Sequence, residues 1–528
     1  MGTQLLVGGR IYSPAAPDAT SMAVTDDTVV WVGEDRPGRA LHPDAEIIDL
    51  DGAFVTPAFV DTHVHVTALG LMLTGLDLTG ARSRRECLDL VRRYADEQDD
   101  AVIWGHGWDE TAWTDEAVAP TTTELDAAAP GRMVYLARID VHSAAASSLL
   151  RRAGGVDPAD AEAPVTADDH HRVRAAAREL LTVAQRARAR TAALDSAAAN
   201  GIVAVHECAG PDISGREDLR ELLAHPHGVE VRAYWGQPVQ TAAEATALLA
   251  ETGAAGLGGD LFVDGAIGSR TAWLHEPYAD RPQTGNAYLD VDTIAAHLRA
   301  CTEAGIQAGF HVIGDASVTA VIEAFERVAT ELGGPAVAAC GHRLEHVEMI
   351  TAEQAATLGA LGVVASVQPV FDALWGGDHG LYAQALGQAR AGALNPFAAM
   401  AAAGVSLAFG SDAPVTPVDP WAMLRAAVNH RTEGSGVSPR AAFSAATRGA
   451  RRAGGVRDGL AGTLVPGVPA SYAVWEAGEL VVTAAKDSVQ RWSTDPRSRV
   501  PALPHLDPGS PNPVCLKTVH RGETIYER

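Results

Sequence analysis

The sequence predicts an α/β fold in which eight strand and helix units close into a (β/α)8 barrel. Apolar runs typical of buried strands alternate with helical stretches, and this alternation favours a parallel sheet. The expected barrel strands lie at 55–65, 202–207, 229–234, 261–264, 306–311, 343–347, 363–367 and 405–411. An open doubly wound sheet fits less well, because no glycine-rich phosphate fingerprint follows an opening strand.

The regions outside the barrel strands suggest additional structural parts, as expected for 528 residues. Short β-like pieces near both ends are separated by glycine, aspartate and proline turns, and we expect them to pair. The expected limits are 1–55 and 456–528 for one composite β-domain and 56–455 for the barrel, with an inserted lid over about 67–170. A helix is expected over 172–199, because Asn200 and Gly201 follow it with helix-ending chemistry.

Charge and composition narrow the expected partners. A formal net charge of −25 argues against a nucleic acid, which needs a concentrated basic surface. We find neither a leader-like N-terminus nor a run of membrane-spanning length, so no membrane partner is expected. Five widely spaced cysteines without a paired spacing favour a reducing cytoplasm. We therefore expect a cytoplasmic protein with a small-molecule substrate, and leave a homodimer open.

Five side chains at the ends of expected strands have the chemistry of metal ligands. His63 and His65 are separated by one residue, so a strand turns both imidazoles to one face. His311, His346 and Asp412 end later apolar runs. Each histidine taken alone is as well explained by a hydrogen bond inside a core, but five groups at strand ends indicate a shared divalent ion. Nitrogen and oxygen ligands from separate strands suggest catalytic zinc.

Several motifs resemble those of the amidohydrolase superfamily, and more narrowly amidohydrolase family 3, the branch that contains N-substituted formamide deformylases. The motifs are Phe59–His65, Asp264–Ala272, Phe310–Asp315, Arg343–His346 and Gly410–Val415, with Trp104–Glu110 and Arg138–His142 in addition. The resemblance covers nearly the whole chain. It implies that His63 and His65 on strand one, His311 on strand five, His346 on strand six and Asp412 on strand eight face the metal centre.

One family element is missing from this sequence. Many members with two metals bridge them by a carbamylated lysine on strand four, whereas the lysines here are Lys486 and Lys517, near the C-terminus. Asp260 lies near the expected position, but its side chain is much shorter than a carbamylated lysine. Glu207 has a longer arm and is a second candidate, although strand parity forbids that His206 and Glu207 both point inward. Without a lysine carbamate, we expect one metal ion rather than two.

The resemblance implies hydrolysis of a non-peptide C–N bond, in an amide or formamide of a small molecule, by a metal-activated water. Asp412 is the expected general base, and His346 is expected to stabilise the developing oxyanion as well as to bind the metal. Asp264, Ser269, Arg270 and Trp108 are candidates for substrate binding, although the first three equally suit a tight turn and Trp108 equally suits packing. Two alternatives stay open: a deaminase or cyclic amide hydrolase, and a catalytically inactive barrel that binds a metabolite.

Overall fold

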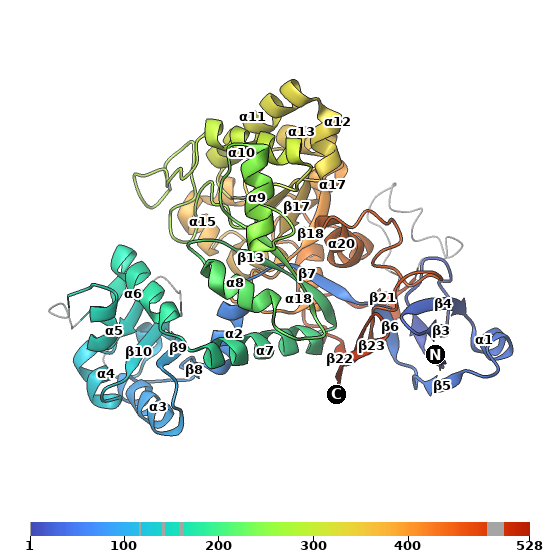
Figure 1. Cartoon of the computed structure of the whole chain (residues 1–528), viewed down its shortest axis with the longest axis horizontal. Helices are drawn as coiled ribbons and strands as arrows, with labels where there is room; N and C mark the ends of the chain where they lie inside the picture. Colours follow the sequence, from blue (N-terminus) through green and yellow to red (C-terminus); the bar gives the residue numbers. More distant parts are fainter. Residues whose placement is uncertain (1, 116–117, 140–142, 158–162, 483–500) are drawn as a thin grey trace. The chain divides into compact units, whose positions relative to one another are not determined.

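The computed structural model describes residues 2–115, 118–139, 143–157, 163–482 and 501–528 (Figure 1). Contacts divide the chain into two compact units. The larger unit contains Met1–His65 and Asp195–Arg528, and the smaller unit contains Val66–Leu194.

Two parallel sheets form the centre of the larger unit. One has the order β14-β13-β7, and the other has the order β15-β16-β17-β18. The strands are β7 (Phe59–Val64), β13 (Ile202–Ala209), β14 (Glu230–Trp235), β15 (Gly309–Val312), β16 (Arg343–His346), β17 (Val364–Val367) and β18 (Ser406–Phe409). Every residue of β7, β13, β15, β16 and β17 is buried, as is typical of parallel strands covered on both faces. Seven of the eight expected strands are therefore present.

Helices follow most of these strands. Those between β13 and β17 are α8 (Gly215–Leu223), α9 (Ala242–Thr252), α10 (Val291–Ala304), α11 (Asp315–Leu332), α12 (Gly334–Cys340) and α13 (Ala352–Ala360). Those after β17 are α14 (Pro369–Trp375), α15 (Leu381–Leu386), α16 (Gln388–Ala391), α17 (Phe397–Ala402), α18 (Pro420–Val428), α19 (Pro439–Ser444) and α20 (Ala450–Ala453). This order gives the expected alternation of strands and helices.

The expected strand at 261–264 is wrong as a regular strand. Isolated parallel bridges instead join Tyr234 to Gly256, Leu257 to Ala308, and Phe262 to His311. Glycines explain the irregularity: a Cβ at Gly258 would lie 2.5 Å from the backbone of Gly309. The segment connects β14 to β15, and a further bridge joins Val64, at the end of β7, to Ala413, beyond β18.

Strands from both ends of the chain form one mixed sheet with the order β2-β6-β19-β22-β23. These strands are β2 (Arg10–Ile11), β6 (Phe54–Pro57), β19 (Tyr472–Glu476), β22 (Val514–His520) and β23 (Glu523–Glu527). A second sheet, β4-β3-β1-β5, contains β1 (Thr3–Val7), β3 (Ser21–Thr25), β4 (Thr28–Gly33) and β5 (Glu46–Asp49), and α1 (Asp35–Leu41) follows β4. The apolar run from Val55 is thus divided, because β6 pairs with β19 and only β7 joins the central sheet.

The smaller unit has its own sheet, in the order β12-β11-β10-β9-β8. Its strands are β8 (Leu76–Asp77), β9 (Val102–Trp108), β10 (Met133–Arg138), β11 (Ser143–Ala146) and β12 (Val165–Thr166), and its helices are α2 (Val66–Thr74), α3 (Arg84–Glu97), α4 (Thr122–Ala128), α5 (Ser148–Ala153), α6 (Ala167–Glu179) and most of α7 (Val183–Ala199). The unit continues beyond the expected insertion end near 170, because Val173, Leu181 and Ala189 contribute to its core. The helix expected over 172–199 is divided between α6 and α7. The expected role of this inserted segment as a lid stays a prediction.

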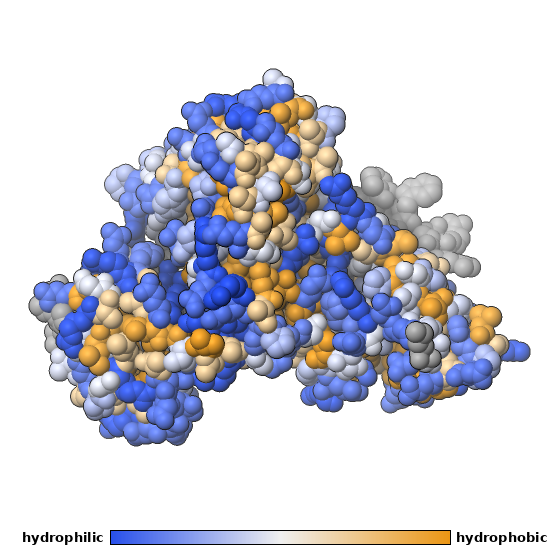
Figure 2. Space-filling model, in the orientation of Figure 1, coloured by the Kyte–Doolittle hydropathy of each residue, from blue (hydrophilic) through white to orange (hydrophobic). Residues whose placement is uncertain are grey.

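The surface of the protein mixes polar and apolar side chains. Figure 2 shows hydrophilic residues over much of the visible face, with apolar residues in groups between them. Large apolar side chains that are exposed, such as Leu41 and Val183, belong to different parts of the sequence. None of the helices that the structure describes combines the length and the apolar character needed to cross a membrane.

Candidate metal centre

Six side chains from separate parts of the larger unit meet around one point. They are His63, His65, Asp260, His311, His346 and Asp412. Their ligand atoms form three overlapping groups in which all atoms lie within 4.8 Å of one another: His63, His65 and Asp260; His63, His346 and Asp412; and Asp260, His311 and His346. All five ligands expected from the strand ends are therefore brought together, with Asp260 in addition.

Strand β7 positions the first two imidazoles. His63 Nε2 lies 3.5 Å from Asp260 Oδ1 and 3.5 Å from Asp412 Oδ1. His65 Nε2 lies 3.2 Å from Asp260 Oδ2 and 3.3 Å from Asp412 Oδ1. His63 Nε2 is completely buried and has no hydrogen-bond partner. A buried nitrogen of this kind, facing two carboxylates among other imidazoles, fits the ligand set of a divalent ion such as zinc.

Asp260 lies between the imidazoles despite its short side chain. Its Oδ1 is 3.4 Å from His311 Nδ1 and 3.5 Å from His63 Nε2, while its Oδ2 lies 3.2 Å from His65 Nε2. The backbone explains this reach, because Asp260 follows two glycines and packs closely against Gly236, where a Cβ would lie 2.6 Å from the Asp260 carbonyl oxygen. The argument from side-chain length against Asp260 is therefore wrong.

Backbone conformation directs the side chains at the ends of β16 and β18. His346, Val347 and Asp412 have φ values of 68°, 52° and 57°, in the left-handed region that a β-branched valine rarely adopts. In a regular strand Glu345 and His346 would face opposite sides, but the left-handed turn at His346 lets both approach His63. Unusual backbone of this kind persists where the surrounding structure determines it, often at functional sites.

The carboxylates make the cluster favourable for positive charge. Burial alone would lower the pKa of His65, but hydrogen bonds and charges from Asp260 and Asp412 raise it to about 10. Burial would likewise raise the pKa of each of these two carboxyls, yet His63 and neighbouring imidazoles hold both below the usual range. Burial, with the charges of His311 and His63, lowers the pKa of His346 to about 3. A cation among these groups would compensate the two carboxylates.

A buried ion pair supports His63 from behind. His63 Nδ1 lies 3.0 Å from Glu345 Oε2, and Arg343 donates to both Glu345 oxygens, at 2.6 and 2.8 Å. Cys208 also lies close to His63 and Glu345. Reasoning from the sequence missed these groups. The sequence does contain a signal for them. Arg343 and Glu345 are two residues apart, so a buried strand places their opposite charges on the same face.

Glu207 lies in none of the candidate metal groups among the described residues. His206 Nδ1 contacts Arg343 Nη1 at 3.0 Å and Cys208 approaches His63, so these alternate residues of β13 face the cluster. Glu207 lies between them and is buried, and regular strand alternation would turn its side chain to the other face of β13. Strand parity therefore argues against the tentative assignment of Glu207 as a ligand, and that assignment stays a prediction.

The carboxylate of Asp264 is buried and is held by hydrogen bonds within the protein. It accepts hydrogen bonds from the backbone N–H groups of Ile313, Gly314 and Trp273 and from the Ser317 hydroxyl, at 2.8–3.0 Å. The side chain is fully buried. The structure thus favours the loop-shaping role of Asp264 over the expected substrate contact.

Replacement of Asp264 by asparagine tests this role. We expect the free energy of unfolding to fall by about 1–3 kcal/mol, because the asparagine oxygen can keep the donors that meet Oδ2, whereas its NH₂ group faces the Ile313 N–H and leaves it without an acceptor. Urea titration measures the change. Ser269→Ala is the control in the same loop, and equal stability of the two variants would contradict the assignment.

Ser269 and Arg270 are also engaged within their loop. The Ser269 hydroxyl lies 2.6 Å from Thr271 Oγ1 and 3.2 Å from the Ala266 carbonyl oxygen. The Arg270 guanidinium donates to Asp280 and to the carbonyl oxygens of Ile267 and Gly268. These contacts correspond to the tight turn that the sequence left open for this motif.

Trp108 belongs to the core of the smaller unit. The side chain is fully buried, its Nε1 donates to the Leu136 carbonyl oxygen at 2.8 Å, and Arg138 lies over the ring. The structure therefore favours packing over the expected substrate contact. Asp140 and His142, in the motif Arg138–His142, lie outside the described residues.

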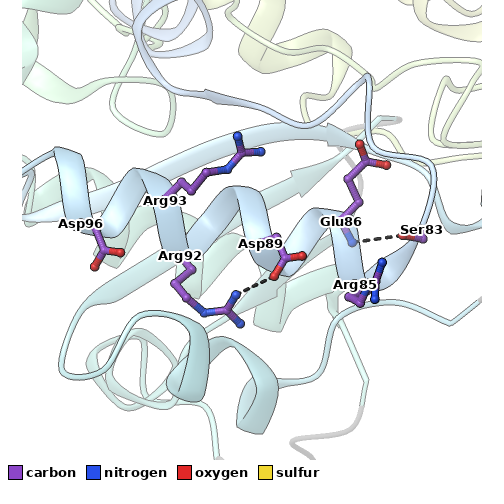
Figure 3. Close-up of a pocket in the computed structure, with 7 residues that line it drawn as sticks. All are labelled: Ser83, Arg85, Glu86, Asp89, Arg92, Arg93 and Asp96. Carbon is purple, nitrogen blue, oxygen red and sulfur yellow. Dashed lines mark hydrogen bonds and ion pairs between the residues drawn. The ribbon is translucent and has the colours of Figure 1, made fainter.

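A shallow hollow along α3 of the smaller unit is lined mainly by charged side chains of both signs (Figure 3). It is lined by Ser83, Arg85, Glu86, Asp89, Arg92, Arg93 and Asp96. Arg92 pairs with Asp89, and the Ser83 hydroxyl accepts from the Glu86 backbone to cap the helix. These are the contacts of a solvated helix face.

Comparison with known proteins agrees with this geometry. The solved structure of an uncharacterized metal-dependent hydrolase from Pyrococcus furiosus is 26% identical, with a TM-score of 0.74, and the match covers 89% of this chain and 98% of that one. Protein LONG AFTER FAR-RED 3 of Arabidopsis thaliana is 27% identical over 80% of this chain and 77% of that protein. YtcJ of Bacillus subtilis (strain 168) is 28% identical over 80% of this chain and 82% of that protein. The model of the amidohydrolase family matches residues 46–526, and the chain therefore belongs to the amidohydrolase family.

Proposed function

We propose that this protein is a metal-dependent hydrolase that cleaves a non-peptide C–N bond, in an amide or formamide of a small molecule. The observation that carries the proposal is the convergence of four imidazoles and two carboxylates, with the buried His63 Nε2 free of any hydrogen bond. The formamide deformylase-like branch is part of the proposal, on the motif resemblance. So are zinc as the metal and a reducing cytoplasm as the location, the latter supported by five free cysteines.

We further propose that Asp260 takes the place of the absent lysine carbamate. A single ion was expected because that carbamate is missing, but Asp260 supplies a carboxylate between the imidazole pairs His63–His65 and His311–His346. The absent lysine is therefore no longer a reason to exclude a second ion. Metal analysis of the purified chain decides the count: one equivalent per chain supports the single-ion expectation, and two equivalents overturn it.

The proposed reaction gives separate roles to the metal, Asp412 and His346. A bound divalent metal would lower the pKa of water and polarise the substrate carbonyl. Asp412 would accept the proton of the attacking water and deliver it to the departing nitrogen. His346 Nδ1 donates to Gln368 Oε1 at 2.7 Å, so its Nε2 keeps a lone pair. That lone pair suits a metal ligand, and we propose this role for His346 instead of hydrogen-bond donation to an oxyanion.

The proposal includes the finer architecture. We propose a closed (β/α)8 barrel in which 256–263 occupies the fourth position, with a composite β-domain from both termini. The bridges on both sides of the two parallel sheets support closure, and the shared sheet β2-β6-β19-β22-β23 supports the composite domain. The metal cluster would then lie where barrel enzymes place their active sites, at the C-terminal ends of the strands.

Metal removal tests the proposed function. We expect dialysis against a chelator to abolish hydrolysis of the best substrate in a panel of small amides and formamides, and added Zn²⁺ to restore it. The products are identified by chemical analysis, because a new carboxylate or formate supports the proposed bond, whereas ammonia released without a new carboxylate or formate indicates a deaminase. A metal-loaded protein that hydrolyses no panel member but binds a metabolite tightly would contradict the proposal.

A further inference from the structure

We infer that Arg343 and Glu345 are positioning residues, which hold His63 in the tautomer whose Nε2 lone pair faces the metal cluster. The inference concerns residues behind the proposed ligands. It rests on the proposed function in one respect, namely that His63 binds a metal. It adds two residues that would determine how well the site binds that metal.

The contacts of Glu345 determine which ring nitrogen of His63 carries the hydrogen. Glu345 Oε2 lies 3.0 Å from His63 Nδ1, and both groups are completely buried. Both Glu345 oxygens already accept from Arg343, so the contacts fit an ionised carboxylate, which only accepts hydrogen bonds. His63 Nδ1 must therefore donate. In a neutral imidazole this leaves Nε2 as the nitrogen with a lone pair, and it is Nε2 that faces Asp260 and Asp412.

Arg343 fixes Glu345 to four neighbouring strands. Its Nη2 donates to the Thr62 carbonyl oxygen of β7 at 2.6 Å and to Ser366 Oγ of β17 at 3.2 Å. Its Nη1 lies 3.0 Å from His206 Nδ1 of β13, and its Cζ lies 4.2 Å from the ring centroid of Tyr234 on β14. These contacts hold the Arg343 guanidinium, and its two hydrogen bonds to Glu345 hold the carboxylate in one orientation. The direction of the His63 ring is thus set by the core of the unit.

Stability alone does not require this arrangement. A buried ion pair often contributes little to folding, because the cost of removing both charges from water offsets their attraction. An outer carboxylate that orients a histidine ligand and raises its basicity has a clear role at a metal site. The contrast with His346 supports this role, because the hydrogen bond of its Nδ1 goes to the neutral amide of Gln368. His63 is therefore the imidazole of this pair that receives a charged acceptor.

The test measures metal affinity in the metal-free full-length chain. Glu345→Gln removes the negative charge that faces His63 and leaves one acceptor oxygen for the three donors that Glu345 meets, so we expect the dissociation constant for Co²⁺ and Zn²⁺ to rise about 10–100-fold. We also expect the visible absorption of bound Co²⁺ to change, because the ligand field at His63 changes. Competition with a chromophoric chelator gives the dissociation constants. Neither measurement depends on turnover.

The matched control is Glu348→Gln. Glu348 is also fully buried and lies two residues beyond His346, but its Oε2 accepts from Asn395 Nδ2 at 3.3 Å. Within the described parts of the chain it makes no hydrogen bond to a proposed ligand. We expect this variant to bind Co²⁺ like the wild type, with the same absorption. A loss of affinity in both variants would show a general effect of amide substitution in this core and overturn the inference.

A measurement on the unmodified protein covers the case in which Glu345→Gln does not fold. In the Zn²⁺-loaded chain labelled with ¹⁵N-histidine, we expect NMR to show His63 protonated at Nδ1 and metal-bound through Nε2, with His63→Gln for assignment. Metal bound through Nδ1 would overturn the inference. Co²⁺ binding by Glu345→Gln with unchanged affinity and spectrum would overturn it alone, whereas a wild-type chain that binds neither metal would overturn the proposed function with it.

Discussion

Asp412→Asn is expected to lower kcat by about 10²–10⁴-fold, the range that a positioned acid or base contributes. Asp412 Oδ1 lies 3.5 Å from His63 Nε2 and 3.3 Å from His65 Nε2, at the centre of the cluster, and 8% of the residue is exposed. The asparagine amide has the same size but cannot take a proton from water. Asparagine also tolerates the left-handed backbone at this position, where φ is 57°, so the fold should be preserved.

Steady-state kinetics on the metal-loaded variant measure this effect, with metal content determined for each preparation. Asp419→Asn is the matched control: Asp419 caps α18 by accepting from Ala422, and asparagine caps helices as well as aspartate does. We expect that variant to keep the wild-type kcat. Retained turnover in metal-loaded Asp412→Asn would remove Asp412 from the proposed base role.

Regular strands explain what could be predicted from the sequence. His63 in β7 and His65 directly after it both face Asp260 and Asp412, as a spacing of two residues predicts, and the register of β15 against β16 places His311 opposite Glu345 and beside His346. The positions of the apolar runs were therefore enough to predict that five side chains, distant in the sequence, lie close together. Regular strand alternation argues against Glu207 as a ligand, because His206 and Cys208 face the cluster.

Irregular backbone explains what could not be predicted. Regular strand alternation would place the side chains of Glu345 and His346 on opposite faces. The φ of 68° at His346 brings both toward His63, and no local sequence pattern predicts that value. Asp260 lies in a segment held by isolated bridges and glycines, where reach depends on how closely backbones pack. Side-chain length, the only measure that a sequence offers, gave the wrong answer there.

Asp260→Asn is expected to weaken metal binding by more than the 10–100-fold typical of a group that only orients a ligand. Asp260 Oδ1 and Oδ2 face His311 and His65 respectively, so the carboxylate is shared by two of the overlapping donor groups. The amide keeps the volume but removes the negative charge and one of the two acceptor oxygens. Titration of the metal-free variant with Co²⁺ measures the loss, and turnover should fall with it. Tight binding by this variant would contradict the assignment of Asp260 as a ligand.

The origin of the carboxylate gives a second and independent expectation. A lysine carbamate forms from an amine and CO₂, so a site that depends on one responds to bicarbonate during metal loading. Asp260 carries its carboxylate permanently, and the lysines of this chain are Lys486 and Lys517, far along the sequence from the cluster. We therefore expect metal content and activity to be the same whether metal is loaded with bicarbonate or in CO₂-free buffer. A requirement for bicarbonate would contradict the proposal that Asp260 replaces the carbamate, even if Asp260→Asn also lost its metal.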